Sequence, residues 1–216
     1  MIKKYKDYII LLIVFLFIIF GSNINAFLRS FDNNLNSNNI NNNYCTSLEN
    51  DYNELLKIND FKITSELNLV VSKVMLRDIY EFSDTLTIYK GTNAGIKEGN
   101  AVITDKGLIG VISKVNKESS VVKLITNKSS NISVRIGSSY GILNMQDNSL
   151  IVSDLSMYDD VFIGEEVYTS GIGNLPGDIY IGNVIDIKAN NTEIEKILEV
   201  SPVVDLSMIN YVMVVV

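Results

Sequence analysis

The residues of this chain that could do chemistry are Thr169, Ser170 and Gly171. A serine before a glycine, in a loop between two apolar-alternating runs, is typical of a nucleophile that attacks an acyl group. Such a serine needs a base to take its proton and an acid to orient that base. The chain has no histidine, and no lysine is close to Ser170 in the sequence, although a distant lysine stays open. We therefore predict that Ser170 caps a turn and that Gly171 and Gly173 supply positive backbone dihedrals.

The remaining polar motifs do not predict a metal or cofactor site. The pairs Asp159-Asp160 and Glu165-Glu166 could bind calcium, but neither lies in an EF-hand frame. The Gly-x-Gly of the same loop lacks the third glycine and the helix of a dinucleotide site. We expect no catalytic residue, no metal and no cofactor.

Composition narrows the class of protein further. The net charge of -7 argues against a nucleic-acid surface, which normally carries a basic face. Cys45 is the single cysteine, so neither a disulfide within the chain nor a His/Cys zinc site can form. Cys45 is then either a small residue without a special role or one half of an intermolecular disulfide in a dimer.

The N-terminus is typical of a membrane anchor. Lys3, Lys4 and Lys6 precede an unbroken apolar run over residues 8–20, and continuing it to residue 28 gives the roughly 20 residues that a span requires. We predict a cytoplasmic tail at 1–7, a transmembrane anchor at 8–28 and an extracytoplasmic location for the rest, because the lysines stay inside. The alternative is a cleaved signal peptide, for which the cleavage site is poor.

Residues 29–65 are predicted to be an Asn-rich linker followed by a short helical stalk. Asparagine dominates residues 32–43, which are poor in helix formers. A helix is expected from Leu48 to Phe61. Leu48, Tyr52 and Leu55 follow the same heptad spacing as the apolar residues before the Asn-rich stretch, and the heptad positions between the two groups are polar. The pattern fits either a short parallel coiled coil or a single stalk helix.

Residues 66–216 predict an all-β domain built of two small β-barrels. Short apolar-alternating runs are separated by turn signals, with no convincing helix between them. The subdomain split stays open, with strands expected to be intertwined, and the last strand is expected to pin the C-terminus in a sheet. The runs in the second half are Val161 to Val167, Ile179 with Ile181, Val184 to Ile187, Ile197 with Val200, and Tyr211 to Val216.

An internal repeat supports two related β-units. Ile96–Thr104 matches Val161–Thr169 at a constant offset, and Ile109–Val115 then matches Ile181–Ile187 with an offset larger by seven residues. The growth falls around Gly173 to Asp178, so the second unit carries an enlarged loop. We predict that this loop binds a partner, through the following residues: Thr169, Ser170, Gly171, Asn174, Leu175 and Pro176.

Several sequence pieces follow one another over most of the chain: Lys90-Gly-Thr-Asn-Ala-Gly-Ile-Lys-Glu-Gly-Asn-Ala-Val-Ile103, Gly107-Leu-Ile-Gly110, Val134-Arg-Ile136, Gly164-Glu-Glu-Val-Tyr-Thr-Ser-Gly171, Leu175-Pro-Gly177, Ile181-Gly182, Pro202, Asp205-Leu206 and Tyr211-Val212. In this order the pieces resemble the rod shape-determining protein MreC family.

The resemblance implies a non-enzymatic scaffold with two extracytoplasmic β-barrels, usually a dimer. In that family it organises the wall-elongation machinery and links MreB filaments and MreD to RodA and a class B penicillin-binding protein. The family's barrels look protease-like but lack a triad, and its stalk is usually a longer coiled coil than the Asn-rich one here. Two other classes are compatible with an anchored β-module: a membrane-fusion-type adaptor of an export system, which usually carries a long helical hairpin, and a secreted serine hydrolase.

Overall fold

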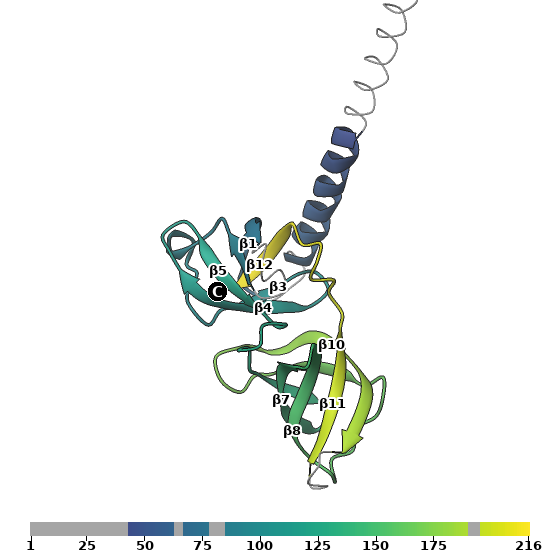
Figure 1. The fold of residues 1–216 in the computed structure, drawn as a ribbon. Helices are drawn as coiled ribbons and strands as arrows, with labels where there is room; N and C mark the ends of the chain where they lie inside the picture. The colour runs from purple at the N-terminus through teal and green to yellow at the C-terminus, as the bar shows by residue number, and fades with distance from the viewer. Residues whose placement is uncertain (1–42, 63–66, 78–84, 190–194) are drawn as a thin grey trace, which may run out of the picture. The chain divides into compact units, whose positions relative to one another are not determined.

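A computed structural model describes residues 43–62, 67–77, 85–189 and 195–216 (Figure 1). The predicted tail at 1–7, the anchor at 8–28 and most of the Asn-rich linker lie outside these residues. Among the described residues, no helix combines the length and the apolar character needed to cross a membrane. The chain divides into two compact units, Met1–Asn53 and Glu54–Val216.

Residues 43–62 are helical throughout, so the helix predicted from Leu48 to Phe61 is confirmed. Leu48 and Tyr52, one helical turn apart in the first unit, are both exposed. In the second unit, Ile58 is buried in the main hydrophobic core, and Phe61 packs against that core. The Glu54 carboxylate accepts the backbone N–H of Tyr211 at 3.2 Å. The end of the helix is therefore docked on the β-domain of its own unit.

The second unit is built of strands, and their bounds are β1 (Leu69–Arg77), β2 (Thr85–Ile88), β3 (Ala101–Ile103), β4 (Leu108–Val115), β5 (Ser120–Leu124), β6 (Ile132–Ile136), β7 (Ser139–Gln146), β8 (Ser149–Ser156), β9 (Glu166–Ser170), β10 (Gly177–Ala189), β11 (Glu195–Pro202) and β12 (Tyr211–Val215). A short 3-10 turn, Thr92–Ala94, lies between β2 and β3. Strands such as β5 and β6 alternate buried and half-buried residues, as the period of two predicted.

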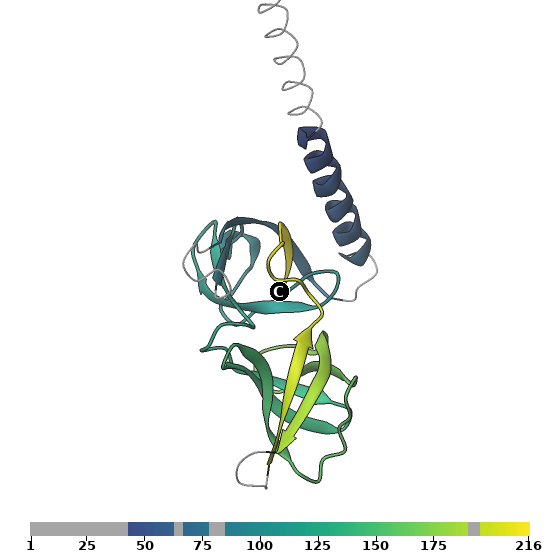
Figure 2. The same cartoon turned by 45° about the vertical axis from the view of Figure 1, so that its right-hand side comes forward.

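These strands close two six-stranded barrels, in the orders β1-β12-β3-β4-β5-β2 and β10-β11-β8-β7-β6-β9. Figure 2 shows the two barrels as separate groups of strands. The expectation of two small barrels is confirmed. The second barrel is one continuous piece, β6 to β11, inserted between β5 and β12. The last strand pairs with both β1 and β3, so the predicted pinning of the C-terminus is also confirmed.

The two barrels have the same ring order once their strands are matched. Starting at β12, the first barrel runs β12-β1-β2-β5-β4-β3, and starting at β6, the second runs β6-β7-β8-β11-β10-β9. The strand that opens the second barrel therefore corresponds to β12, which the first barrel receives from the far end of the chain. The first barrel is a circular permutation of the second.

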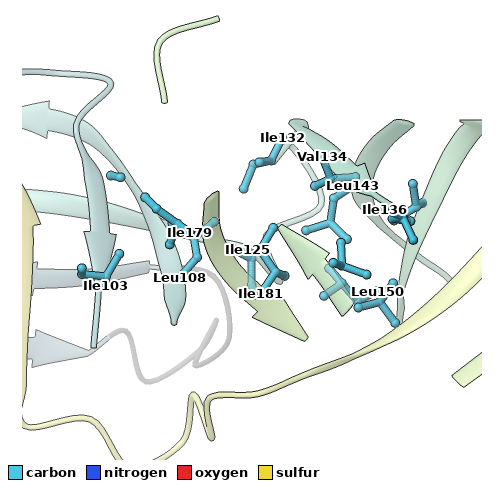
Figure 3. Packing of buried hydrophobic residues seen from close by; sticks show 14 of the residues in the cluster. Ile103, Leu108, Ile125, Ile132, Val134, Ile136, Leu143, Leu150, Ile179 and Ile181 are labelled. Carbon is cyan, nitrogen blue, oxygen red and sulfur yellow. The ribbon is translucent and has the colours of Figure 1, made fainter. Parts of the chain in front are cut away.

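The main core joins side chains from both barrels (Figure 3). Ile103 and Leu108 of the first barrel belong to the same cluster as Ile179 and Ile181 of β10. The backbone N–H of Val203 also donates to the carbonyl of Ile181 at 2.9 Å. The first barrel has a second core of its own, around Leu86, Ile88, Val102, Ile109, Val122 and Val214.

Two strand predictions in the second barrel were wrong in detail. The run Val161–Val167 is a strand only from Glu166, because the chain turns at Gly164 with a φ of +92°. The two runs predicted between Ile179 and Ile187 form the single strand β10, in which Gly182 lies against the backbone of β11.

Candidate functional site

The candidate site begins at the repeated turn, which the structure builds in the same way in both barrels. In the first barrel, Gly99 has a φ of +88° and donates its N–H to Ile112 O at 2.8 Å, while Ile112 N–H donates to Asn100 O at 2.9 Å. In the second barrel, the Gly164 N–H donates to Val184 O at 2.7 Å, and Val184 N–H donates to Glu165 O at 2.9 Å. Gly99 corresponds to Gly164, and Ile112 to Val184, in the internal repeat found in the sequence.

The side chains that close this turn also correspond. Asn100 Oδ1 accepts the backbone N–H of Lys97 at 2.6 Å, and Glu165 Oε2 accepts that of Phe162 at 3.1 Å. The preceding apolar residue, Ile96 or Val161, is buried in both barrels. The turn is therefore held by the same backbone and side-chain bonds in each copy, which supports the predicted duplication.

The two copies differ in the loop that follows β3 or β9. The first barrel turns tightly, and Thr104 N–H donates to Gly107 O at 2.9 Å. In the second barrel, the corresponding residue Thr169 enters a longer loop that returns at Gly177. The enlargement lies where the change of offset predicted it.

Thr169 is fully buried and fastens the base of the loop. Its Oγ1 donates to Pro176 O at 2.7 Å and accepts the N–H of Ile179 at 3.0 Å. The hydroxyl thus connects the buried face of β9 to Pro176 at the end of the loop and to Ile179 in the strand that follows. Thr169 supports the loop and presents no surface to a partner.

Ser170 behaves as a turn residue. Its Oγ lies 2.8 Å from Ser133 Oγ and accepts the N–H of Ile172 at 3.0 Å. Gly171 and Gly173 have φ values of +76° and +98°. The predicted turn cap and both positive dihedrals are confirmed, and the Ser170 hydroxyl is bonded to a second hydroxyl rather than to a base.

The tip of the loop divides into supporting and exposed residues. Leu175 is half-buried and packs against the main core, and Pro176 is also half-buried. Asn174 and Ile172 are exposed. Of the six residues predicted to bind a partner, Asn174 and Gly171 are the exposed ones, while the others shape and hold the loop.

A row of interacting side chains beside the loop was not predicted from the sequence. Arg135 donates to Asp178 Oδ1 at 2.7 Å and lies over the Tyr168 ring, 5.7 Å from its centroid. The rings of Tyr168 and Tyr180 are 5.3 Å apart. The Tyr168 hydroxyl donates to Glu166 at 2.6 Å, and this bond raises the pKa of Tyr168. The strand pairing of β6, β9 and β10 creates the row, and the sequence contains no signal for that register.

The geometry of the site fits a protein surface better than a small molecule. A cavity of about 190 Å³ beside Thr104 and Tyr180 is smaller than typical ligand sites. A larger cleft of about 550 Å³ lies in the first barrel, beside Tyr89 and Lys117. Neither is lined by residues of the Thr169–Pro176 loop. Within the described ranges, no group of three or more His, Cys, Asp or Glu side chains is placed to hold a metal.

Comparison with known proteins gives a family match over residues 74–216, to the model described as "Rod shape-determining protein MreC, barrel core". The cell shape-determining protein MreC of Streptococcus pneumoniae is 34% identical over 126 residues, which are 54% of this chain and 46% of that protein. MreC of Bacillus subtilis is 30% identical over 185 residues, which are 78% of this chain and 62% of that protein. The chain thus spans about half the length of the curated relatives it matches.

Solved structures show the same fold. The major periplasmic domain of the cell shape-determining filament MreC is 30% identical, with a TM-score of 0.60 over 68% of this chain and 97% of that one. MreC in a complex with the penicillin-binding protein PBP2 from Helicobacter pylori is 17% identical, with a TM-score of 0.58 over 69% of this chain and 99% of that one. With its two closed barrels and a family match that covers most of its length, the chain belongs to the rod shape-determining protein MreC family.

Proposed function

We propose that this protein is a non-enzymatic scaffold that organises the cell-wall elongation complex and thereby sets cell shape. The observation that carries the proposal is the match of both barrels, residues 74–216, to the barrel core of a shape-determining family. The bonding of Ser170 supports the non-enzymatic part, because its hydroxyl meets Ser133 and a backbone N–H where a nucleophile would need a base.

The proposed scaffold is held at the membrane. Residues 1–7 would be the cytoplasmic tail, residues 8–28 the anchor, and residues 29–65 the linker and stalk that space the barrel domain, 66–216, from the outer face of the membrane. The lysines before the apolar run support this orientation. The location of a solved relative agrees with it, since the part of that MreC protein whose fold is shared is its major periplasmic domain.

A homodimer through the stalk is part of the proposal. Tyr44, Leu48 and Tyr52 are exposed along the described helix, and Leu48 and Tyr52 occupy the apolar positions of the predicted heptad. Such a row of exposed apolar residues is what a parallel partner helix would cover.

The proposed partners are MreD, MreB, RodA and a class B penicillin-binding protein. The MreC of Helicobacter pylori that was solved with PBP2 supports the last of these, because its fold is shared. We place a partner contact on the exposed tip of the Thr169–Pro176 loop, at Gly171 and Asn174. Their exposure, on a loop whose base is fixed by Thr169, supports this placement.

Depletion of the protein in its own cells tests the proposal. Rods should widen or become round, and the full chain expressed from a second copy should restore them. A tagged full chain should co-purify with MreD or the penicillin-binding protein. Normal rod shape after depletion, with neither partner recovered, would contradict the scaffold function.

A further inference from the structure

The second barrel exposes three large apolar side chains at one turn. Phe162 and Ile163 are 68% and 65% exposed, and Ile185 is 50% exposed. The three are brought together by the turn at Gly164, whose bonded partner is Val184, the residue before Ile185. Phe162, Ile163 and Ile185 are named here the apolar turn patch.

The duplicated turn provides an internal comparison that shows what the fold requires. In the first barrel, the residues equivalent to Phe162 and Ile163 are Lys97 and Glu98, one and two places after the buried Ile96. Both are exposed, as an ordinary surface turn would have them. The same backbone bonds therefore form with charged residues, and the apolar side chains of the second barrel are not needed for the turn.

The third residue of the patch follows the same rule. Ile185 lies at a register shift between β10 and β11, and the equivalent shift between β4 and β5 contains the exposed Ser113. All three patch positions are thus polar in one copy and apolar in the other. Large apolar side chains that are exposed without a folding role mark an interaction surface.

The charge around the patch identifies the chemistry of the partner. Asp160, Glu166 and Asp186 are sequence neighbours of the patch. The described residues of the second barrel, 132–189 and 195–202, include ten carboxylate side chains and three cationic ones. Those of the first barrel, 69–77, 85–124 and 203–216, include four carboxylate side chains and eight cationic ones. The patch therefore lies in an acidic field, which attracts a cationic partner and repels an acidic one.

We infer that the apolar turn patch is a docking surface for a cationic, apolar segment of a partner protein. Three side chains at one turn match a single extended or helical segment, whose apolar residues cover the patch while its lysines or arginines meet the surrounding carboxylates. The patch precedes β9 and the Thr169–Pro176 loop follows it, so the two surfaces lie at opposite ends of that strand. On the proposed scaffold, the apolar turn patch is a second partner contact besides the loop.

Photocrosslinking of the full chain in its own cells tests this surface. A benzophenone amino acid replaces Phe162, and the matched control places it at Lys97, the equivalent position of the first barrel. Crosslinked peptides are identified by mass spectrometry after denaturing purification. We expect Phe162 to capture a segment of another protein that is apolar and carries net positive charge. Introducing Ile163→Ser and Ile185→Ser, which removes the apolar side chains without adding charge, should lower the yield on the order of tenfold.

Each outcome decides the inference. An acidic or uncharged peptide, a peptide from a second copy of this chain, or a yield no higher than at Lys97 overturns it. The double variant should melt within about 4 °C of the wild type, because the first barrel builds the same turn with polar residues at these positions. If depletion leaves rod shape normal while the cationic segment is still captured, the scaffold function fails and the surface stands.

Discussion

Removal of the Thr169 hydroxyl should destabilise the second barrel and loosen its enlarged loop. Thr169→Val keeps the shape of the side chain but deletes the group that bonds Pro176 O at 2.7 Å and Ile179 N at 3.0 Å. Ile179 is buried, so its N–H loses a partner that water does not replace. Pro176 is half-buried, so its carbonyl recovers part of its bonding from solvent.

The expected loss is about 2–3 kcal/mol: about 1 kcal/mol for the bond to Pro176 O, and about 1–2 kcal/mol for leaving the buried Ile179 N–H unsatisfied. For a unit of this size, that corresponds to a fall in Tm of about 4–12 °C. Thermal unfolding of the purified chain, followed by circular dichroism, measures the change.

The duplicated barrel provides the control. Thr104, which corresponds to Thr169, is half-buried and bonds its own turn more loosely, at 3.2 Å to Lys106 N and 3.5 Å to Gly107 O. Thr104→Val should lose less than about 1 kcal/mol. Thr169→Ser keeps the hydroxyl and loses one buried methyl group, so it should lose about 1 kcal/mol, less than Thr169→Val. Equal losses for Thr169→Val and Thr104→Val would refute the reasoning, because burial and loop anchoring would then make no difference.

Three further predictions concern packing, charge and the stalk. Gly182→Ala would place a Cβ against the backbone of β11, so it should destabilise the unit by about 3 kcal/mol or more in urea unfolding; a loss below about 1 kcal/mol would contradict this. Lys188 lies 3.2 Å from Asp186 and 3.3 Å from Glu199. Its hydrogen bond lowers the pKa of Asp186, and the pKa of Glu199 is lowered by the Ser149 hydroxyl and, after it, by Lys188. A carboxyl group whose pKa is lower in the folded than in the unfolded protein stabilises the fold above its unfolded pKa, and this stabilisation is lost as the pH falls. The difference in Tm between wild type and Lys188→Met should therefore narrow below roughly pH 4. A difference in Tm that does not change with pH would contradict the role of Lys188. Cys45 is exposed on the helix, so mild oxidation of membranes should yield a disulfide-linked dimer, whereas a cysteine moved to the opposite helix face should not crosslink.

The duplication was predictable from the sequence because it is local. Gly99 and Gly164 keep the same spacing to their buried apolar neighbour, and both adopt the positive φ that favours glycine. The Ser170 turn was predictable for the same reason, since serine before a glycine caps such turns. Each of these features depends on a few consecutive residues.

The pairing of strands was not predictable in the same way. The role of β12 as the missing first strand of the permuted barrel depends on contacts across most of the domain, such as Leu69 with Val215. The apolar run at Val161–Val167 has the composition of a strand, and the repeat indicates a turn followed by a strand within it. The structure has the turn at Gly164 and begins the strand at Glu166. The turn exposes Phe162 and Ile163, although both side chains are apolar.

Comparing the two barrels within one chain separates folding from function. Features present in both copies are explained by the fold: the turn glycine, the bonds to Ile112 or Val184, and the buried threonine or its looser counterpart at the start of the next loop. Features present in the second copy alone need another cause, because the first barrel folds without them. Those features are the enlarged loop, the apolar turn patch and the excess of carboxylates. Since all three lie on the inserted barrel, the second barrel is the part of this chain on which partner contacts should be sought first.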